Sequence, residues 1–264
     1  MTAGICSAFR ATEDNVMVQR LLLAGMLSGL IVALFAFSFA RVYAEPTIER
    51  AIALEEDVAQ DHASPEEGTV SRSTQRNAGL LTGLASYCAA LGGILAIGLA
   101  SVHGRLSARP RSAVWMLALT GYVALVLVPQ LKYPASPPGV GSAETIGVRT
   151  ELYFVMIMAS AMCMAASAWI AYRTRLRMGP ATAVSIGIGM FVALASLLMT
   201  MMPAISETPH DFPRGLLFEF HVYAALVQLI VWAGLGLLFG QAAEHVVERD
   251  RRMEGVARHG IPNA

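Results

Sequence analysis

The chain has 264 residues, of which 55% are hydrophobic and only 14% are charged, and its mean hydropathy is +0.55. A soluble domain carries roughly 25% charged residues, so this composition excludes an ordinary soluble globular protein. The formal net charge of zero gives no basis for nucleic-acid binding, and three cysteines provide no disulfide framework.

Six stretches are apolar over about 20 residues, the length that crosses a bilayer. We therefore predict an all-α integral membrane protein with six transmembrane helices. The predicted spans are 21–40, 79–102, 113–131, 152–172, 183–202 and 215–240. They form one domain over 19–248, between an N-terminal tail over 1–18 and a C-terminal tail over 249–264.

Arginines gather on one side of this six-span arrangement. They precede the first span, fill the loops after the second and fourth spans, and follow the sixth: Arg20; Arg105, Arg109 and Arg111; Arg173, Arg175 and Arg177; Arg249, Arg251 and Arg252. The positive-inside rule makes that side cytoplasmic. We expect a multi-pass protein of a bacterial inner membrane with both termini in the cytoplasm and the loops 43–78, 131–151 and 203–214 outside.

A weak internal repeat suggests three helical hairpins with their longer loops outward. The triplet Val-Ala-Leu recurs in the first, third and fifth spans, and a proline marks each following loop: 32–34 with Pro46, 123–125 with Pro134, and 192–194 with Pro203. Recurrence by chance in so apolar a composition is the alternative, and both interpretations stay open.

The first outer loop opens with an amphipathic pattern. Over 46–60 the apolar residues Ile48, Ala51 and Ile52 share one face of a helix, and the other face is acidic. Such a face can concentrate divalent cations near a pore, although a solvated surface explains it equally simply. Residues 61–76 are polar, contain proline and glycine, and are predicted to be a loop.

The second outer loop is the most informative stretch of the chain. Its sequence over 131–141 is LKYPASPPGVG, with ETIGVRT over 144–150, and it contains the only lysine, Lys132. Prolines this dense exclude a helix and fix an extended path. We expect Lys132, Tyr133 and Arg149 to pack against the acidic first loop.

The third outer loop carries candidate metal ligands. Glu207, His210 and Asp211 lie close together in sequence, and imidazole with carboxylate suits borderline divalent ions such as cobalt, nickel or zinc. The spacing matches no standard metal motif. The alternative is that Asp211 caps the next helix, Pro213 starts it, and His210 faces water.

The sixth span contains ionisable residues at membrane depth. Arg214, His221 and Gln228 recur at seven-residue steps and share one helix face, and Glu219 lies about a turn inside. Such residues usually face the bundle interior and serve function; interfacial pairing of Glu219 with an outer arginine is the alternative. The methionines in the fourth and fifth spans could line a path for soft metal ions, but methionines that pack or face lipid explain them better.

The loop sequences over 131–141 and 144–150 resemble the signature of the CbtA family, predicted cobalt transporter subunits. The segments EPTIERAI over 45–52 and VSRSTQR over 70–76, and Phe212-Pro213 before the last span, are similar too. The resemblance covers Met17 to about Glu248, with a departure at Phe218–His221, where the family has an arginine. It implies cobalt uptake linked to cobalamin synthesis and a small one-span, histidine-rich partner, CbtB.

These observations together predict a non-enzymatic subunit of a divalent metal uptake system, with cobalt(II) as its ion and no covalently bound cofactor. The predicted metal ligands are Glu207, His210, Asp211 and His221. A structural or gating motif is predicted at Glu45, Glu49, Lys132, Tyr133, Pro134, Pro137, Pro138, Glu144, Arg149, Arg214 and Glu219. The partners implied are the CbtB-like subunit and the lipid bilayer, and an oligomer is compatible with the sequence.

Two other classes of function stay open at this point. One is a membrane enzyme with its site in the outer loops, although the sequence shows no nucleophile–base pair at a recognisable spacing and no HExxH zinc motif. The other is a membrane scaffold or assembly protein whose rigid loops form a docking surface. Metal accumulation by cells that express the chain, with and without its partner, separates the three.

Overall fold

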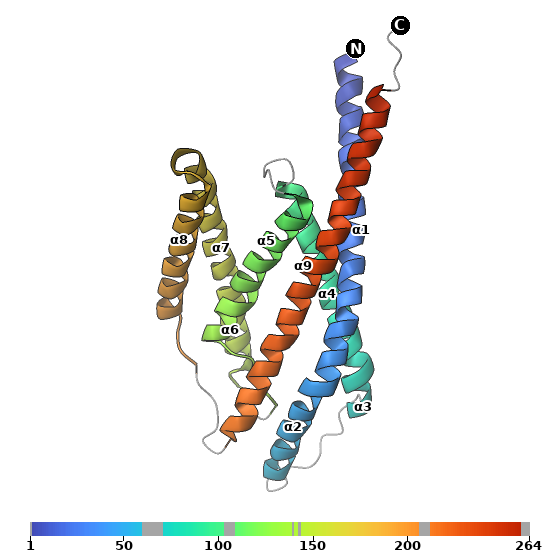
Figure 1. Ribbon diagram of the computed structural model, residues 1–264. Coiled ribbons are helices and arrows are strands. Elements are labelled where there is room, and N and C mark those ends of the chain that lie inside the picture. Colours follow the sequence, from blue (N-terminus) through green and yellow to red (C-terminus); the bar gives the residue numbers. More distant parts are fainter. Residues whose placement is uncertain are drawn as a thin grey trace. The chain divides into compact units, whose positions relative to one another are not determined.

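The structure is a computed structural model that describes residues 2–59, 71–102, 109–138, 140–141, 144–205 and 212–259. Side chains are described from Val16 to Glu56 at the N-terminal end and as far as Met253 at the C-terminal end. Every regular element in these ranges is helical (Figure 1). The predicted all-α class is confirmed.

Nine α-helical segments and three π-helical turns make up the described chain. The α-helices are α1 (Thr2–Phe39), α2 (Glu45–Ala59), α3 (Arg72–Thr74), α4 (Leu80–Val102), α5 (Pro110–Tyr122), α6 (Val128–Lys132), α7 (Ile146–Met178), α8 (Pro180–Met201) and α9 (Arg214–His259). The π turns are η1 (Ala40–Ala44), η2 (Gln75–Gly79) and η3 (Val123–Leu127).

Six continuous helical stretches are long and apolar enough to cross a membrane, which confirms the predicted number. They run over Val16–Glu56, Arg72–Val102, Pro110–Lys132, Ile146–Met178, Pro180–Met201 and Arg214–Met253. Each overlaps one predicted span and most extend beyond it. The predicted loop over 61–76 is wrong in its last part, because Ser71 caps a helix that begins at Arg72.

Two of the π turns have a visible cause in the sequence. The turn Ala40–Ala44 ends two residues before Pro46, and the turn Val123–Leu127 ends two residues before Pro129. Proline has no N–H to donate to the carbonyl four residues earlier. The helix therefore widens locally, and a π bulge is one way to do so.

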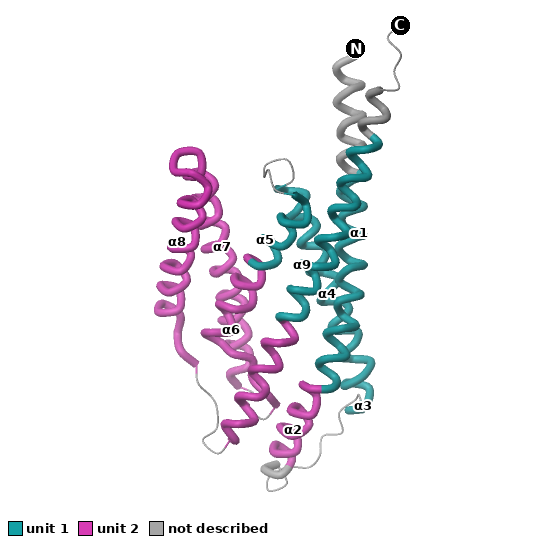
Figure 2. The backbone as a smooth tube through the Cα atoms, viewed as in Figure 1, with its two compact units in different colours: residues 1–42, 67–119, 229–264 teal, residues 43–66, 120–228 magenta. Residues whose placement is uncertain are grey.

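The chain divides into two compact units, coloured in Figure 2. The first comprises residues 1–42, 67–119 and 229–264, and the second comprises residues 43–66 and 120–228. The boundary falls inside α5 and α9, so membrane helices are shared between the units rather than divided at loops.

Close packing of α1 against α4 is the main feature of the first unit. Gly25 and Gly92 approach so closely that a Cβ on either would overlap the carbonyl of the other, and Gly29 meets the Cys88 carbonyl in the same way. Small residues four apart allow transmembrane backbones to touch. This contact holds the first and second spans together.

The C-terminal part of α9 completes the first unit. Buried residues recur at every fourth position on its inner face, namely Val231, Leu235, Phe239, Ala243 and Val247. At its polar end Asp250 pairs with Arg20 of α1 at 2.5 Å. The ion pair links α9 to α1, as does the close contact of Gly234 with Val32.

In the second unit, α8 packs against α7. The two helices are joined by Gly179, whose positive φ of 82° ends α7, and by Pro180, which starts α8. Their core consists of Val128, Met156, Phe191 and Ala195, with half-buried neighbours Val123, Tyr133, Cys163, Met164, Leu198, Met199 and Met202. Of the methionines in the predicted fourth and fifth spans, Met156 therefore lies in this core, and Met164, Met199 and Met202 pack against it.

Candidate functional site

The proline-rich loop follows α6 and has a defined path through the described residues. The helix ends at Tyr133, whose N–H donates to the Pro129 carbonyl at 2.8 Å. Pro137 is buried, and the Val140 N–H donates to its carbonyl across a turn. Pro134 is exposed and Pro138 is half-buried. The predicted absence of helix is confirmed for the described residues from Tyr133 to Gly141, whereas Leu131 and Lys132 still belong to α6.

Lys132 and Tyr133 attach this loop to the end of α8. The Lys132 ammonium donates to the Met199 carbonyl at 2.8 Å, and the Tyr133 hydroxyl donates to the Pro203 carbonyl at 2.7 Å. Desolvation raises the pKa of the Tyr133 phenol above its ordinary value. These hydrogen bonds go to backbone carbonyls in the last turn of α8 and just after it, and not to the acidic first loop as expected. Carbonyls at a helix end lack an intrahelical donor and are available as acceptors.

Arg149 folds back onto the same loop from the first turn of α7. Its guanidinium lies against Gly141, which has a φ of 101° and no room for a Cβ. The guanidinium also donates to the Ser136 hydroxyl at 3.5 Å. Glu144, two residues before α7, is exposed. The loop and the start of α7 therefore form one structure around Arg149.

A pocket of about 500 Å³ opens between the proline-rich loop and the ends of three helices of the second unit. Its walls come from α6 and the loop, the first two turns of α7, Ile205, and the first two turns of α9. The residues that line it are Gln130, Tyr133, Pro134, Ala135, Ser136, Val140, Ile146, Arg149, Thr150, Tyr153, Ile205, Leu217 and His221.

His221 is the one predicted metal ligand that the structure describes. Its Nε2 lies 3.0 Å from the Ala135 carbonyl. A carbonyl oxygen only accepts, so Nε2 carries the proton and donates. If the imidazole is neutral, Nδ1 holds the lone pair, and a metal ion can bind His221 only through that nitrogen.

The other three predicted ligands, Glu207, His210 and Asp211, lie outside the described residues. Within the described ranges, no group of three or more histidine, cysteine, aspartate or glutamate side chains is placed to hold a metal ion. Arg214, at the first position of α9, is exposed. The predicted metal site stays a prediction.

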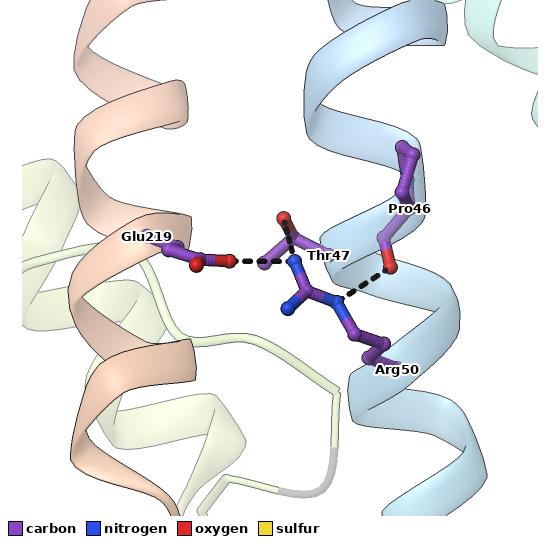
Figure 3. Close-up of polar contacts among 4 residues, drawn as sticks. All are labelled: Pro46, Thr47, Arg50 and Glu219. Atoms are coloured by element: carbon purple, nitrogen blue, oxygen red, sulfur yellow. Dashed lines mark hydrogen bonds and ion pairs between the residues drawn. The ribbon is translucent and has the colours of Figure 1, made fainter.

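Glu219 pairs with an arginine of α2. Arg50 Nη2 lies 2.5 Å from the Glu219 carboxylate and 3.3 Å from the Thr47 hydroxyl, while Arg50 Nε donates to the Pro46 carbonyl at 3.3 Å (Figure 3). Pairing with an outer arginine, the alternative left open for Glu219, is therefore confirmed. The contact joins α2 to α9 within the second unit.

The helix that carries Arg50 has the predicted amphipathic character. Glu45 and Thr47 are buried together with Ala51, whereas Glu49 is exposed. The predicted apolar face turns inward and the acidic face outward. The burial of Glu45 and Thr47 was not predicted, since a glutamate at a helix start usually faces water.

We expect the Arg50–Glu219 pair to add little stability. Both side chains are more than a third exposed, at 56% and 44%, and exposed pairs contribute at most about 1 kcal/mol. Glu219→Gln should therefore lower the free energy of unfolding by less than about 1 kcal/mol, with the loss shrinking further in high salt.

Thermal unfolding of purified protein at low and high salt measures this effect, with Glu248→Gln on the same helix as the control. The swapped double variant Arg50→Glu with Glu219→Arg should recover the low-salt stability. A loss several times larger, or one insensitive to salt, would contradict a solvent-screened pair.

The polar residues that the membrane helices contribute to the pocket wall were not predicted. Gln130 follows Pro129 inside a predicted span, Tyr153 lies at the start of the next predicted span, and Thr150 ends the predicted loop before it. An isolated amide within an apolar run was the available signal.

The six apolar helices define a multi-pass membrane protein, and a pocket lies among the helix ends of its second unit. Comparison with protein families gives a match over residues 18–244 to the family described as "Probable cobalt transporter subunit (CbtA)". The chain belongs to the CbtA family. No curated protein and no solved structure matches it.

Proposed function

We propose that this chain is the membrane-embedded subunit of a cobalt(II) uptake system that serves cobalamin synthesis. The family match over residues 18–244 is the observation that carries this proposal. A small one-span, histidine-rich subunit of the CbtB type is its partner, and the chain itself is not an enzyme. It lies in a bacterial inner membrane with both termini in the cytoplasm, as its arginine distribution favours.

The exposed acidic face of α2 supports capture of a hydrated cation from outside. Glu49, Glu55 and Glu56 are all exposed on this helix, and a surface of one charge sign raises the local concentration of counter-ions. The membrane potential then favours inward movement of a divalent ion by about 4.6 kcal/mol per 100 mV, at about 2.3 for each charge.

We place the outer metal site at Glu207, His210, Asp211 and His221. The first three lie in the connection between α8 and α9. His221 would contribute Nδ1, since its Nε2 donates to the Ala135 carbonyl. Because imidazole must be deprotonated to bind a metal, uptake should fall as the pH is lowered.

Uptake of labelled cobalt by cells with and without the partner subunit tests the proposal. At low cobalt, His210→Ala, Asp211→Asn and His221→Gln should each lower uptake about tenfold, because even outer-shell partners of metal ligands contribute roughly 10- to 100-fold in affinity. His245→Ala, an exposed histidine elsewhere on α9, is the matched control. Normal uptake by the triple variant at equal expression would exclude this site.

A further inference from the structure

The C-terminal end of α7, away from the proline-rich loop, carries three arginines: Arg173, Arg175 and Arg177. The sequence contains no aspartate or glutamate between Glu151 and Glu207. Glu151 precedes Arg173 on the same helix by 22 residues, which is about 33 Å at about 1.5 Å per residue. The closed end of the α7–α8 hairpin (Figure 1) therefore has three positive charges and no acid in its own sequence.

Two of these arginines lie over aromatic rings of the preceding turn. The Arg173 guanidinium is 5.2 Å from the centre of the Trp169 ring, and the Arg175 guanidinium is 4.2 Å from the centre of the Tyr172 ring. Both distances are typical of cation–π contacts. An arginine that only caps a helix end reaches forward to the last carbonyls, whereas these two reach back toward the apolar part of α7.

The position of these side chains along α7 matches the edge of a bilayer. Residues 152–172 contain no charged side chain, and as a helix they span about 30 Å, the thickness of the hydrocarbon core. Tryptophan and tyrosine are enriched at the membrane–water interface. Since Trp169 and Tyr172 end this apolar stretch, the guanidiniums that contact them lie at the level of the lipid head groups.

The surface at this end of α7 is open and partly apolar. Trp169, Tyr172 and Leu176 are 60%, 46% and 89% exposed, and Arg173 and Arg177 are exposed as well. Trp169, Arg173 and Arg177 are four residues apart and share one helix face. Apolar side chains among the arginines favour a lipid over a water-soluble acidic partner. We define the arginine–aromatic patch as Trp169, Tyr172, Arg173, Arg175, Leu176 and Arg177.

We propose that the arginine–aromatic patch binds the phosphate head group of an anionic phospholipid, so that the chain selects such lipids from its bilayer. Guanidinium matches phosphate oxygens in geometry as well as in charge, and basic side chains at the ends of membrane helices attract anionic lipid. Trp169 and Leu176 offer apolar contact to the same lipid. Ile146, which lines the pocket, lies at the other end of α7, so the proposal does not depend on the metal site.

Quenching of Trp169 fluorescence by brominated lipids tests the proposal. The full chain has three tryptophans, and Trp115→Phe with Trp232→Phe leaves Trp169 as the reporter. This protein is reconstituted in phosphatidylcholine vesicles that contain the same fraction of brominated phosphatidylglycerol or of brominated phosphatidylcholine. We expect phosphatidylglycerol to associate with the patch about fivefold more strongly, and high salt to reduce the difference.

Matched double variants separate lipid binding from a role in helix stability alone. Arg173→Gln with Arg177→Gln should abolish the lipid preference, whereas lysine at both positions should retain most of it. Arg251→Gln with Arg252→Gln removes the same charge from exposed arginines of α9 and should leave the preference unchanged. If the arginines only stabilise the helix end, the glutamine variant changes the thermal stability while the lipid preference persists.

Because Trp232 is buried and its replacement can disturb packing, the chain with all its tryptophans provides a second route. Its Tm in nanodiscs should be higher with phosphatidylglycerol than with phosphatidylcholine, since a ligand of the folded state stabilises it. The difference should vanish in the Arg173→Gln, Arg177→Gln variant and persist in the α9 variant. A preference in neither measurement, or one that survives the loss of Arg173 and Arg177, would overturn the proposal.

Discussion

Replacing Gly92 by valine is expected to separate α1 from α4 and to lower thermal stability strongly. A Cβ at this position would overlap the Gly25 carbonyl, which is backbone and cannot rotate away. Overpacking of a filled interior costs about 1–3 kcal/mol and more where backbone must move. A decrease in Tm of about 5–10 °C follows for a chain of this size.

The same helix provides the control for this substitution. Gly83→Val introduces an identical side chain on α4 at a position where a Cβ meets nothing within 4 Å. Any effect of valine on helix propensity is therefore common to both variants. Thermal unfolding of the purified proteins in detergent measures the difference. Equal Tm values for the two variants would show that α1 and α4 do not pack through Gly25 and Gly92.

The sequence predicted the six membrane helices because their signal is purely local. A run of about 20 apolar residues is sufficient to identify a span, and the amphipathic helix after the first span has its own 3.6-residue period. The close approach of Gly25 to Gly92 was not predicted. It depends on which faces of two helices meet, and glycines are common throughout this apolar chain.

The π turns within the membrane helices were not predicted, for a related reason. Pro46 and Pro129 were visible, and each removes one helical donor. Whether the chain responds with a break, a kink or a π turn depends on what can satisfy the freed carbonyl. At η1, the side chain of Arg41 donates to Asn77 of η2 at 3.1 Å, a tertiary contact that no local pattern contains.

The candidate site was predicted only in part. The proline-rich loop was singled out correctly because prolines constrain the backbone wherever they occur. The hydrogen-bond partners of the charged residues in this loop were not predicted. A flexible lysine can reach several acceptors, and charge alone favoured the acidic first loop. A sequence does not show which backbone carbonyls at a helix end can accept a hydrogen bond, yet Lys132 donates to one of them, the Met199 carbonyl. Glu219 of α9 pairs with Arg50 of α2, a contact between helices that lie far apart in the sequence.

Lys132→Met is expected to loosen the junction between the proline-rich loop and α8. The ammonium donates to the Met199 carbonyl, in the last turn of a helix that ends at Met201. A positive charge there interacts favourably with the helix dipole and satisfies a carbonyl that has no intrahelical donor. Methionine matches lysine in length but offers no proton, so we expect a loss of about 1–3 kcal/mol.

Two neighbouring variants separate charge from packing. Lys132→Arg keeps both the charge and a donor and should retain most of the stability, whereas Tyr133→Phe removes only the neutral hydrogen bond to Pro203 and should cost about 1 kcal/mol. Hydrogen exchange of the amides in the last turn of α8 gives a local readout alongside Tm. Faster exchange confined to that turn in Lys132→Met, and not in Lys132→Arg, would establish the lysine as the cap of α8. Unchanged exchange in Lys132→Met would mean that the carbonyl of Met199 is satisfied without the lysine and that the lysine does not cap α8.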